Sequence, residues 1–101
     1  MDMGAVASAR ADVRSIVRVG MHELSIAMSL VELACEEKQR RDLPEVRAVR
    51  LRLGVRSGVV KEALTFSFDL AAAGTCIEGA ALNIEEAPGQ ELELFALEVE
   101  D

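Results

Sequence analysis

The chain has 101 residues, of which 50% are hydrophobic and 3% aromatic, and its formal net charge at pH 7 is −7. This length and composition predict one small domain with an aliphatic core. The negative charge and the lack of Trp and Tyr argue against binding of nucleic acid, which needs cationic contacts or stacking platforms. No apolar stretch is long enough to span a membrane.

Residues 1–20 differ from the rest in being rich in Ala, Val and Arg. Three arginines recur at every fourth position and would share one face of a helix: Arg10, Arg14 and Arg18. The segment lacks the apolar core of a secretory signal. Three interpretations stay open, namely a disordered tail, a short basic helix, or sequence upstream of a true start at Met21. We therefore expect an N-terminal extension over 1–20 and a domain over 21–101.

The segment from Met21 begins a regular pattern. Met21–Leu24 is expected to form a short strand, and Ser25 to cap the helix that follows. Helical spacing predicts one apolar face, formed by Ile26, Ala27, Leu30, Val31, Leu33 and Ala34, with Glu37 continuing the same spacing. The sequence Asp42-Leu43-Pro44 ends this helix of about four turns.

A second strand and a second helix follow. Apolar residues alternate with Arg50, Arg52 and Gly54, which predicts a strand with one dry and one basic face: Val49, Leu51, Leu53 and Val55. Ser57 is expected to cap a helix from about Val60 to Ala72. Its predicted apolar face is Ala63, Leu64, Ser67, Phe68 and Ala71, extended by Phe66 and Leu70. Gly74 supplies the left-handed conformation that commonly closes a helix.

The C-terminal third predicts two more strands. Ala81–Glu85 is the first of them, with Leu82 and Ile84 inward, and Pro88-Gly89 turns the chain. The last strand changes its apolar phase between Leu92/Leu94 and Leu97/Val99, so a bulge near Phe95-Ala96 is expected. The fold class is α+β, with two helices packed on one face of a small mixed β-sheet in the order β-α-β-α-β-β.

Charge is distributed unevenly along the chain. The segment Lys38–Lys61 is mainly basic, and every charged residue from Glu62 to the C-terminus is acidic. One interpretation is that basic and acidic strands pair across the wet face of the sheet. The other is a polarised docking surface for a protein partner.

The two cysteines, Cys35 and Cys76, have no CxxC spacing and cannot form a zinc site by themselves. Cys35 falls inside the first helical pattern, where a thiol behaves as a small apolar group. We expect no disulfide framework, as suits a reducing compartment.

His22 is the only histidine and stands next to Met21 and Glu23. Nickel(II) favours square-planar nitrogen coordination, which an amino-terminal amine, backbone nitrogens and one imidazole can supply. A lone histidine is more commonly a surface or hydrogen-bonded residue. Neither Cys35 nor Ser57 has an assembled base, so we do not expect an enzyme.

The sequence MHELSIAMSLVELACEE resembles the amino terminus of the HypA/HybF family of nickel metallochaperones of hydrogenase maturation. The segment VRAVRLRLGVRSGVVKEALTFSFDLAAAGTCIEGAALNIEEAPG resembles that family's second strand, second helix and third strand, and GQELELFALEVE its closing strand. The resemblance runs from Met21 to the C-terminus.

This resemblance implies a cytoplasmic carrier that delivers nickel(II) for insertion into nickel–iron hydrogenase. It implies nickel ligands at His22 (imidazole), Met21 (if it is the mature N-terminus) and Glu23 (backbone nitrogen or nearby carboxylate). Its implied partners are a HypB-like GTPase and the large subunit of the hydrogenase, and a homodimer is a further option.

Two departures from the family pattern bear on these expectations. Twenty residues precede Met21, so its amine is free only if the chain starts there. The family also carries a zinc module with two CxxC pairs before its closing strand, and we expect its deletion between residues 88 and 91. Pro88-Gly89-Gln90 is then predicted to join two neighbouring strands as a hairpin. The alternative function is a metal-free degenerate homologue that acts as a protein-interaction module.

Overall fold

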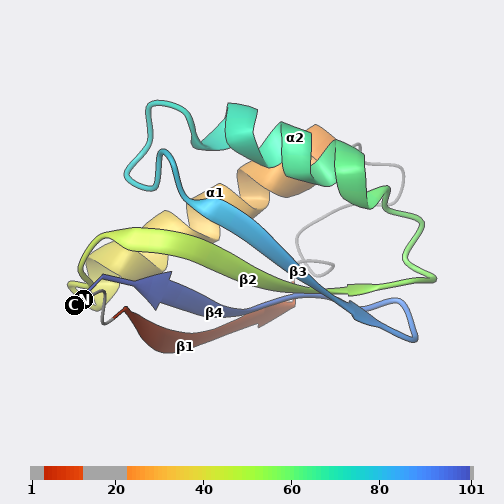
Figure 1. The fold of residues 1–101 in the computed structure, drawn as a ribbon, viewed down its shortest axis with the longest axis horizontal. Coiled ribbons are helices and arrows are strands. Elements are labelled where there is room, and N and C mark those ends of the chain that lie inside the picture. Colours follow the sequence, from red (N-terminus) through yellow and green to blue (C-terminus); the bar gives the residue numbers. More distant parts are fainter. Residues whose placement is uncertain (1–3, 13–22, 101) are drawn as a thin grey trace.

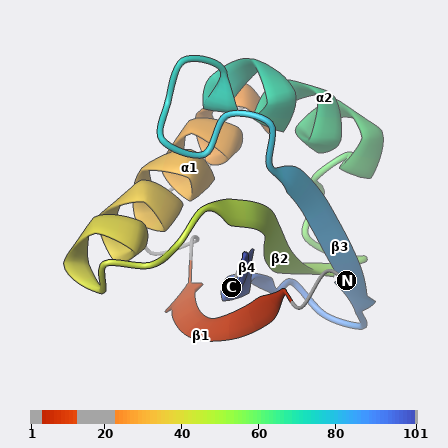
Figure 2. The same cartoon turned by 60° about the vertical axis from the view of Figure 1, so that its left-hand side comes forward.

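The computed structural model describes residues 4–12 and 23–100, and it consists of one helical layer on one β-sheet (Figure 1). The elements are, in chain order, β1 (Ala5–Asp12), α1 (Glu23–Arg40), β2 (Val46–Gly54), α2 (Lys61–Ala72), β3 (Ala81–Ala87) and β4 (Leu92–Val99). Both helices lie on the same face of the sheet (Figure 2). The predicted α+β class and the order β-α-β-α-β-β are confirmed, although the first strand of that order is Ala5–Asp12 and not the segment predicted at Met21–Leu24.

The sheet has the strand order β1-β4-β2-β3. The strand β2 is parallel to β3 and antiparallel to β4, and β1 is antiparallel to β4. The predicted hairpin between the last two strands is therefore wrong, because β2 lies between β3 and β4. The physical reason is the apolar content of β4, which suits a strand paired on both edges: five of its residues are buried, namely Leu92, Leu94, Ala96, Leu97 and Val99.

The connection from β3 to β4 crosses the end of β2 at Gly54. The Gly54 nitrogen donates to the Glu91 oxygen at 2.7 Å, and the Arg56 nitrogen donates to the Gly89 oxygen at 2.8 Å. A Cβ on Gly54 would lie 2.1 Å from the Gly89 oxygen. This close approach of two backbones explains a glycine at the end of an otherwise apolar strand.

The core lies between the helices and the sheet. From the helices it takes Ile26, Ala27, Leu30, Val31, Ala34, Leu64, Phe68 and Ala72, and from β2 it takes Val46, Val49, Leu51 and Leu53. The apolar face predicted for α1 is confirmed, with Leu33 at its half-buried edge. The face predicted for α2 is confirmed at Leu64 and Phe68. Its extension is wrong, because Phe66 and Leu70 are exposed.

The predicted ends of the helices are partly wrong. Glu23 and Leu24 belong to the first turn of α1 and not to a strand, so Ser25 lies inside the helix and does not cap it. Met21 lies outside the described residues. Ser57 does not cap α2 either: its Oγ accepts from the Val59 nitrogen at 3.2 Å, and α2 begins after Val60.

The helices end as expected. Asp42 adopts a left-handed φ of 50°, and the Leu43 nitrogen donates to the Lys38 oxygen at 2.9 Å, which closes α1 with a bond of the Schellman type. Gly74 has a φ of 77° beyond the end of α2, as predicted. The chain then turns through Thr75 into β3.

The strand β1 was not expected. Ala5–Asp12 pairs with β4 at the edge of the sheet, so a helix is the wrong interpretation for this part of the extension. Arg10 of this strand lies beside Glu93 of β4 at 3.1 Å. Arg14 and Arg18 lie outside the described residues. The predicted start of the chain at Met21 stays a prediction.

The strand β4 contains the predicted bulge. In its pairing with β2 the register passes from Arg50↔Ala96 to Leu51↔Leu94, which leaves Phe95 as the extra residue. The bulge lets Leu94 and Leu97 both face the core although they are three positions apart. Neither α1 nor α2, the helices within the described residues, has the length and apolar character required to cross a membrane.

Candidate functional site

The predicted nickel site is centred on Met21, His22 and Glu23. Met21 and His22 lie outside the described residues. Glu23 is the first residue of α1, and its Oε2 accepts a hydrogen bond from the backbone nitrogen of Val60 at 3.1 Å. Val60 immediately precedes α2, so the beginnings of the two helices are adjacent. Of the three predicted ligands only Glu23 is described, and it lies at the junction between α1 and α2.

This contact gives the Glu23 carboxylate a structural role. Val60 is the N-cap of α2 and supplies no side-chain hydrogen bond of its own. The carboxylate of Glu23, from another helix, accepts a hydrogen bond from the N-cap nitrogen. In a capping box, a glutamate of the same helix accepts this hydrogen bond. Its negative charge also lies at the positive end of the α2 dipole.

Both donor types predicted for Glu23, its backbone nitrogen and its carboxylate, stay predictions, because the other two predicted ligands, Met21 and His22, lie outside the described residues.

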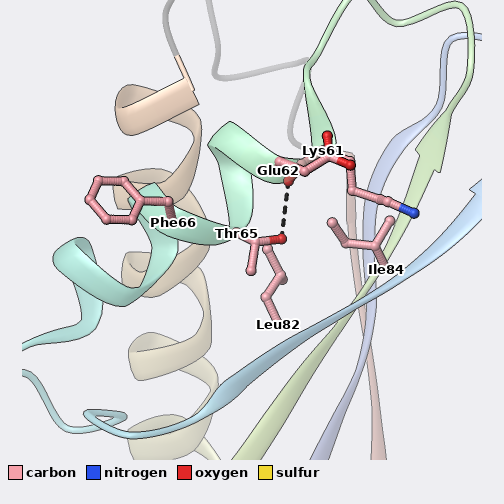
Figure 3. Close-up of a pocket in the computed structure, with 6 residues that line it drawn as sticks. All are labelled: Lys61, Glu62, Thr65, Phe66, Leu82 and Ile84. Atoms are coloured by element: carbon pink, nitrogen blue, oxygen red, sulfur yellow. Dashed lines mark hydrogen bonds between the residues drawn. The ribbon is translucent and has the colours of Figure 1, made fainter.

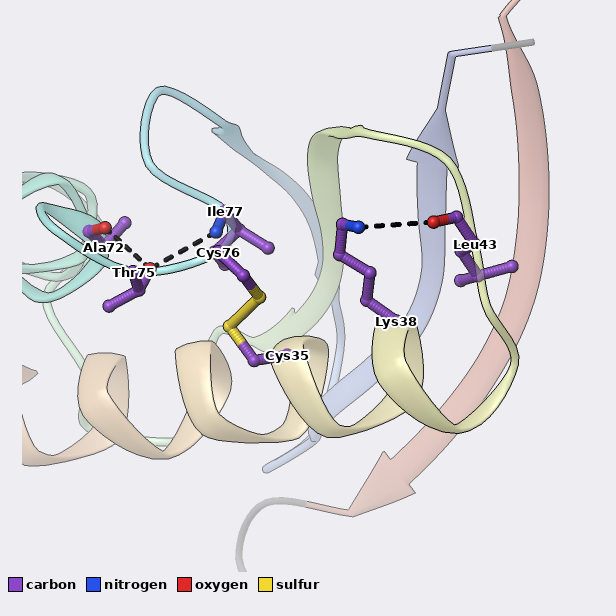
Figure 4. Close-up of a disulfide and its surroundings, with 7 residues drawn as sticks. All are labelled: Cys35, Lys38, Leu43, Ala72, Thr75, Cys76 and Ile77. Atoms are coloured by element: carbon purple, nitrogen blue, oxygen red, sulfur yellow. Dashed lines mark hydrogen bonds between the residues drawn. A yellow bond between two sulfur atoms is a disulfide. The ribbon is translucent and has the colours of Figure 1, made fainter.

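No further metal site is present within residues 4–12 and 23–100, where no group of three or more His, Cys, Asp or Glu side chains could hold an ion. The two cysteines are not available as zinc ligands, because Cys35 and Cys76 form a disulfide (Figure 4). The described residues thus do not fit a structural zinc ion. The ligands expected from the family are absent here.

The disulfide corrects the expectation that both thiols are free. It joins α1 to the turn between α2 and β3, with 6.1 Å between the two Cα atoms. Thr75 organises this turn, since its Oγ1 donates to the Ala72 oxygen at 2.7 Å and accepts from the Ile77 nitrogen at 3.3 Å (Figure 4). Ile77 is buried against the core next to Cys76. The pairing also removes the cysteine-based argument for a reducing compartment.

The open face of the sheet is a network of ion pairs. Arg52 contacts Glu85 and Glu93, each at 3.0 Å, and Arg50 contacts Glu98 at 2.8 Å. These contacts join β2 to both of its neighbours, so the prediction that basic and acidic strands pair across the wet face is confirmed. The guanidinium of Arg52 also lies 4.4 Å from the centroid of the Phe95 ring.

The network shifts the pKa values of its members. Hydrogen bonds from Arg50 and then Asn83 lower the pKa of Glu98 from its ordinary value, against a smaller opposing effect of burial. The carboxylate of Glu85, followed by that of Glu93, raises the pKa of Arg52. At neutral pH these groups are charged, and the two members of each pair carry opposite charges. They therefore act as strand-pairing residues and not as acid or base catalysts.

Taken together, these features define a small two-layer α+β domain whose distinctive polar junction lies where its two helices begin. The comparison with protein families is consistent with this class. Residues 21–92 match the model described as "Hydrogenase/urease nickel incorporation, metallochaperone, hypA". The chain belongs to the HypA family.

Individual relatives show the same pattern. The chain is 59% identical over 70 residues to "Hydrogenase maturation factor HypA" of Roseiflexus sp., which covers 69% of this chain and 57% of the relative. It is 45% identical over 71 residues to the protein of the same name from Streptomyces avermitilis, covering 69% of this chain and 54% of that one. This chain thus spans little more than half the length of the curated relatives it matches.

A solved structure supports the fold. The chain resembles "Solution structure of the Ni metallochaperone HypA from Helicobacter pylori" with a TM-score of 0.62 and 25% identity. The likeness covers 66% of this chain and 58% of that one. The family match begins at Met21 and ends at residue 92, so β1 and nearly all of β4 lie outside it.

Proposed function

We propose that this protein is a nickel carrier in hydrogenase maturation. The observation that supports this most directly is the family match, which begins at Met21, the residue that would start the nickel-binding sequence. The relatives from Roseiflexus sp. and Streptomyces avermitilis carry the name of a hydrogenase maturation factor. The carrier holds nickel(II) as cargo and performs no catalysis of its own.

In the proposed site, nickel(II) takes nitrogen ligands in a square plane. Three of its four ligands are the α-amine of Met21 when that residue is the terminus, the imidazole of His22, and the backbone nitrogen of Glu23. The carboxylate of Glu23 remains with Val60, which holds the site against the beginning of α2. No zinc ligand is assigned, because the two cysteines form a disulfide and no group of three or more potential ligands occurs among the described residues.

The proposed delivery places this domain between a HypB-like GTPase and the large subunit of nickel–iron hydrogenase, in the cytoplasm. These partners are proposals that rest on the family resemblance. A homodimer remains a further option.

A second candidate is a metal-free interaction module. It is favoured by one observation: the extension before Met21 takes part in the fold, because Ala5–Asp12 pairs with β4. As long as this extension stays covalently attached, Met21 has no free amine. The two candidates therefore differ in whether the extension is removed.

The test is nickel binding by protein that starts at Met21, measured by equilibrium dialysis. We expect one nickel ion per chain, and none after His22→Ala. Because this protein lacks β1, far-UV circular dichroism of both forms must first show the same folded spectrum. Equal binding by the His22→Ala variant would refute the proposed site.

A further inference from the structure

An open groove lies between α2 and β3 (Figure 3). We call it the β3 edge groove, and it is lined by Lys61, Glu62, Thr65, Phe66, Leu82 and Ile84, with a volume of about 460 Å³. Leu82 of β3 lies below Thr65 and Ile84 lies to its right beneath Lys61, whereas the Phe66 ring stands at the opposite end, on the left (Figure 3). Phe66 is 66% exposed, and with Leu82 and Ile84 it gives the groove an apolar lining of the kind that marks interaction sites.

The strand beside this groove is an open edge. Among the described strands, β3 is paired with β2 alone. An edge strand directs half of its backbone N–H and C=O groups outward, where they can pair with another chain. The sequence of β3, ALNIEEA, contains none of the Pro and Lys residues that commonly block such edges. An extended segment can therefore add to β3 as a further strand.

The charges around the groove define the chemistry of that segment. Exposed carboxylates are carried by both elements and by the turn between them: Glu62, which lines the groove, and Asp69, Glu78 and Glu86. Lys61 is the one base of α2, β3 and this turn, and its Nζ lies 3.6 Å from Glu86. The surface is therefore acidic, and it favours a basic partner.

We propose that the β3 edge groove binds an extended segment of a partner protein, with alternating apolar residues flanked by Lys or Arg, as an added strand along β3. The apolar residues would enter the groove over Leu82 and Ile84, and the flanking bases would face the acidic rim. A second copy of this chain is disfavoured, because its own β3 would bring Glu85 and Glu86 to an edge that is already acidic. The inference goes beyond the proposed function, since it requires no metal.

The probe is the synthetic peptide Lys-Lys-Val-Thr-Val-Thr-Val-Lys-Lys, titrated into the ¹⁵N-labelled full chain and followed by amide chemical shifts. We expect the largest shifts in β3 and in the first turns of α2. Phe66→Ala should weaken binding about tenfold, which corresponds to about 1.4 kcal/mol. The matched control is Met28→Ala, a 58% exposed apolar residue on α1 outside the groove, which should leave the affinity unchanged.

Three results would overturn the proposal. The first is a set of shifts that lies elsewhere on the molecule. The second is equal binding of a peptide with Glu in place of Lys, or of one whose alternate amides are N-methylated and cannot pair with β3. The third is concentration-dependent self-association through β3 without peptide, which would assign the edge to a second copy. Nickel binding is measured separately, and Phe66→Ala should not change it.

Discussion

Reduction of the Cys35–Cys76 disulfide is expected to lower the free energy of unfolding by about 4 kcal/mol. The bridge joins residues that are 41 positions apart. For a loop of this length the chain-entropy relation gives about 13 cal/mol/K, which is about 4 kcal/mol at room temperature. A domain of this size has a total stability of about 5–15 kcal/mol, so the loss is a large fraction of it.

The assay is urea unfolding with and without a phosphine reductant. Far-UV circular dichroism is the appropriate signal, because the chain has no Trp or Tyr for fluorescence. With an m-value of about 1–2 kcal/mol/M, the urea midpoint should fall by about 2–4 M on reduction. The control is the double variant Cys35→Ala/Cys76→Ala, whose midpoint should not respond to reductant. Coincident unfolding curves for the oxidised and reduced wild-type protein would refute the reasoning.

Three further predictions concern the junctions of the fold. Gly54→Ala should lower the free energy of unfolding in urea by about 3 kcal/mol or more, because the added Cβ would lie 2.1 Å from the Gly89 oxygen. The control is Gly58→Ala, whose Cβ would meet nothing within 4 Å. It should cost about 1 kcal/mol, because only the φ of 82° is unfavourable for alanine. Arg50→Gln should cost about 1 kcal/mol or less at pH 7. The folded state lowers the pKa of Glu98, so this stabilisation is present above the ordinary value of 4.5 and is lost as the pH falls through the lower folded value. The difference in melting temperature between wild type and variant should therefore shrink as the pH is lowered below 4.5. Glu23→Ala should lower the melting temperature by about 4–8 °C, because the capping contact to Val60 is lost. The same substitution in protein that starts at Met21 should leave nickel binding unchanged. Loss of nickel in that variant would show that the carboxylate is a ligand.

Local patterns in the sequence predicted much of this structure. The phase change between Leu94 and Leu97 predicted the bulge at Phe95, because a strand with period two cannot bury both residues without an extra one. The alternation of Arg50 and Arg52 with apolar residues likewise predicted the wet face of β2. These features depend on residues that are close in sequence.

Features that depend on distant residues were not predictable in the same way. The contact between Glu23 and Val60 spans 37 positions, and the pairing of Cys35 with Cys76 spans 41. Both arise from the packing of α1 against α2, which no local pattern specifies. The position of β3 at the sheet edge is also a property of strand order, so the exposure of Phe66 appeared only in the structure.

The central claim is that nickel binds at Met21–Glu23 once the amine of Met21 is free. The most direct measurement places a specific protease site immediately before Met21 in the full chain, and compares bound nickel per chain before and after cleavage. Because the full chain folds with β1 present and is cleaved only afterwards, nickel content before and after cleavage is compared in protein that has folded in the same way. We predict no stoichiometric nickel before cleavage, one ion per chain after it, and none after cleavage of the His22→Ala variant. Equal nickel content before and after cleavage would contradict the account.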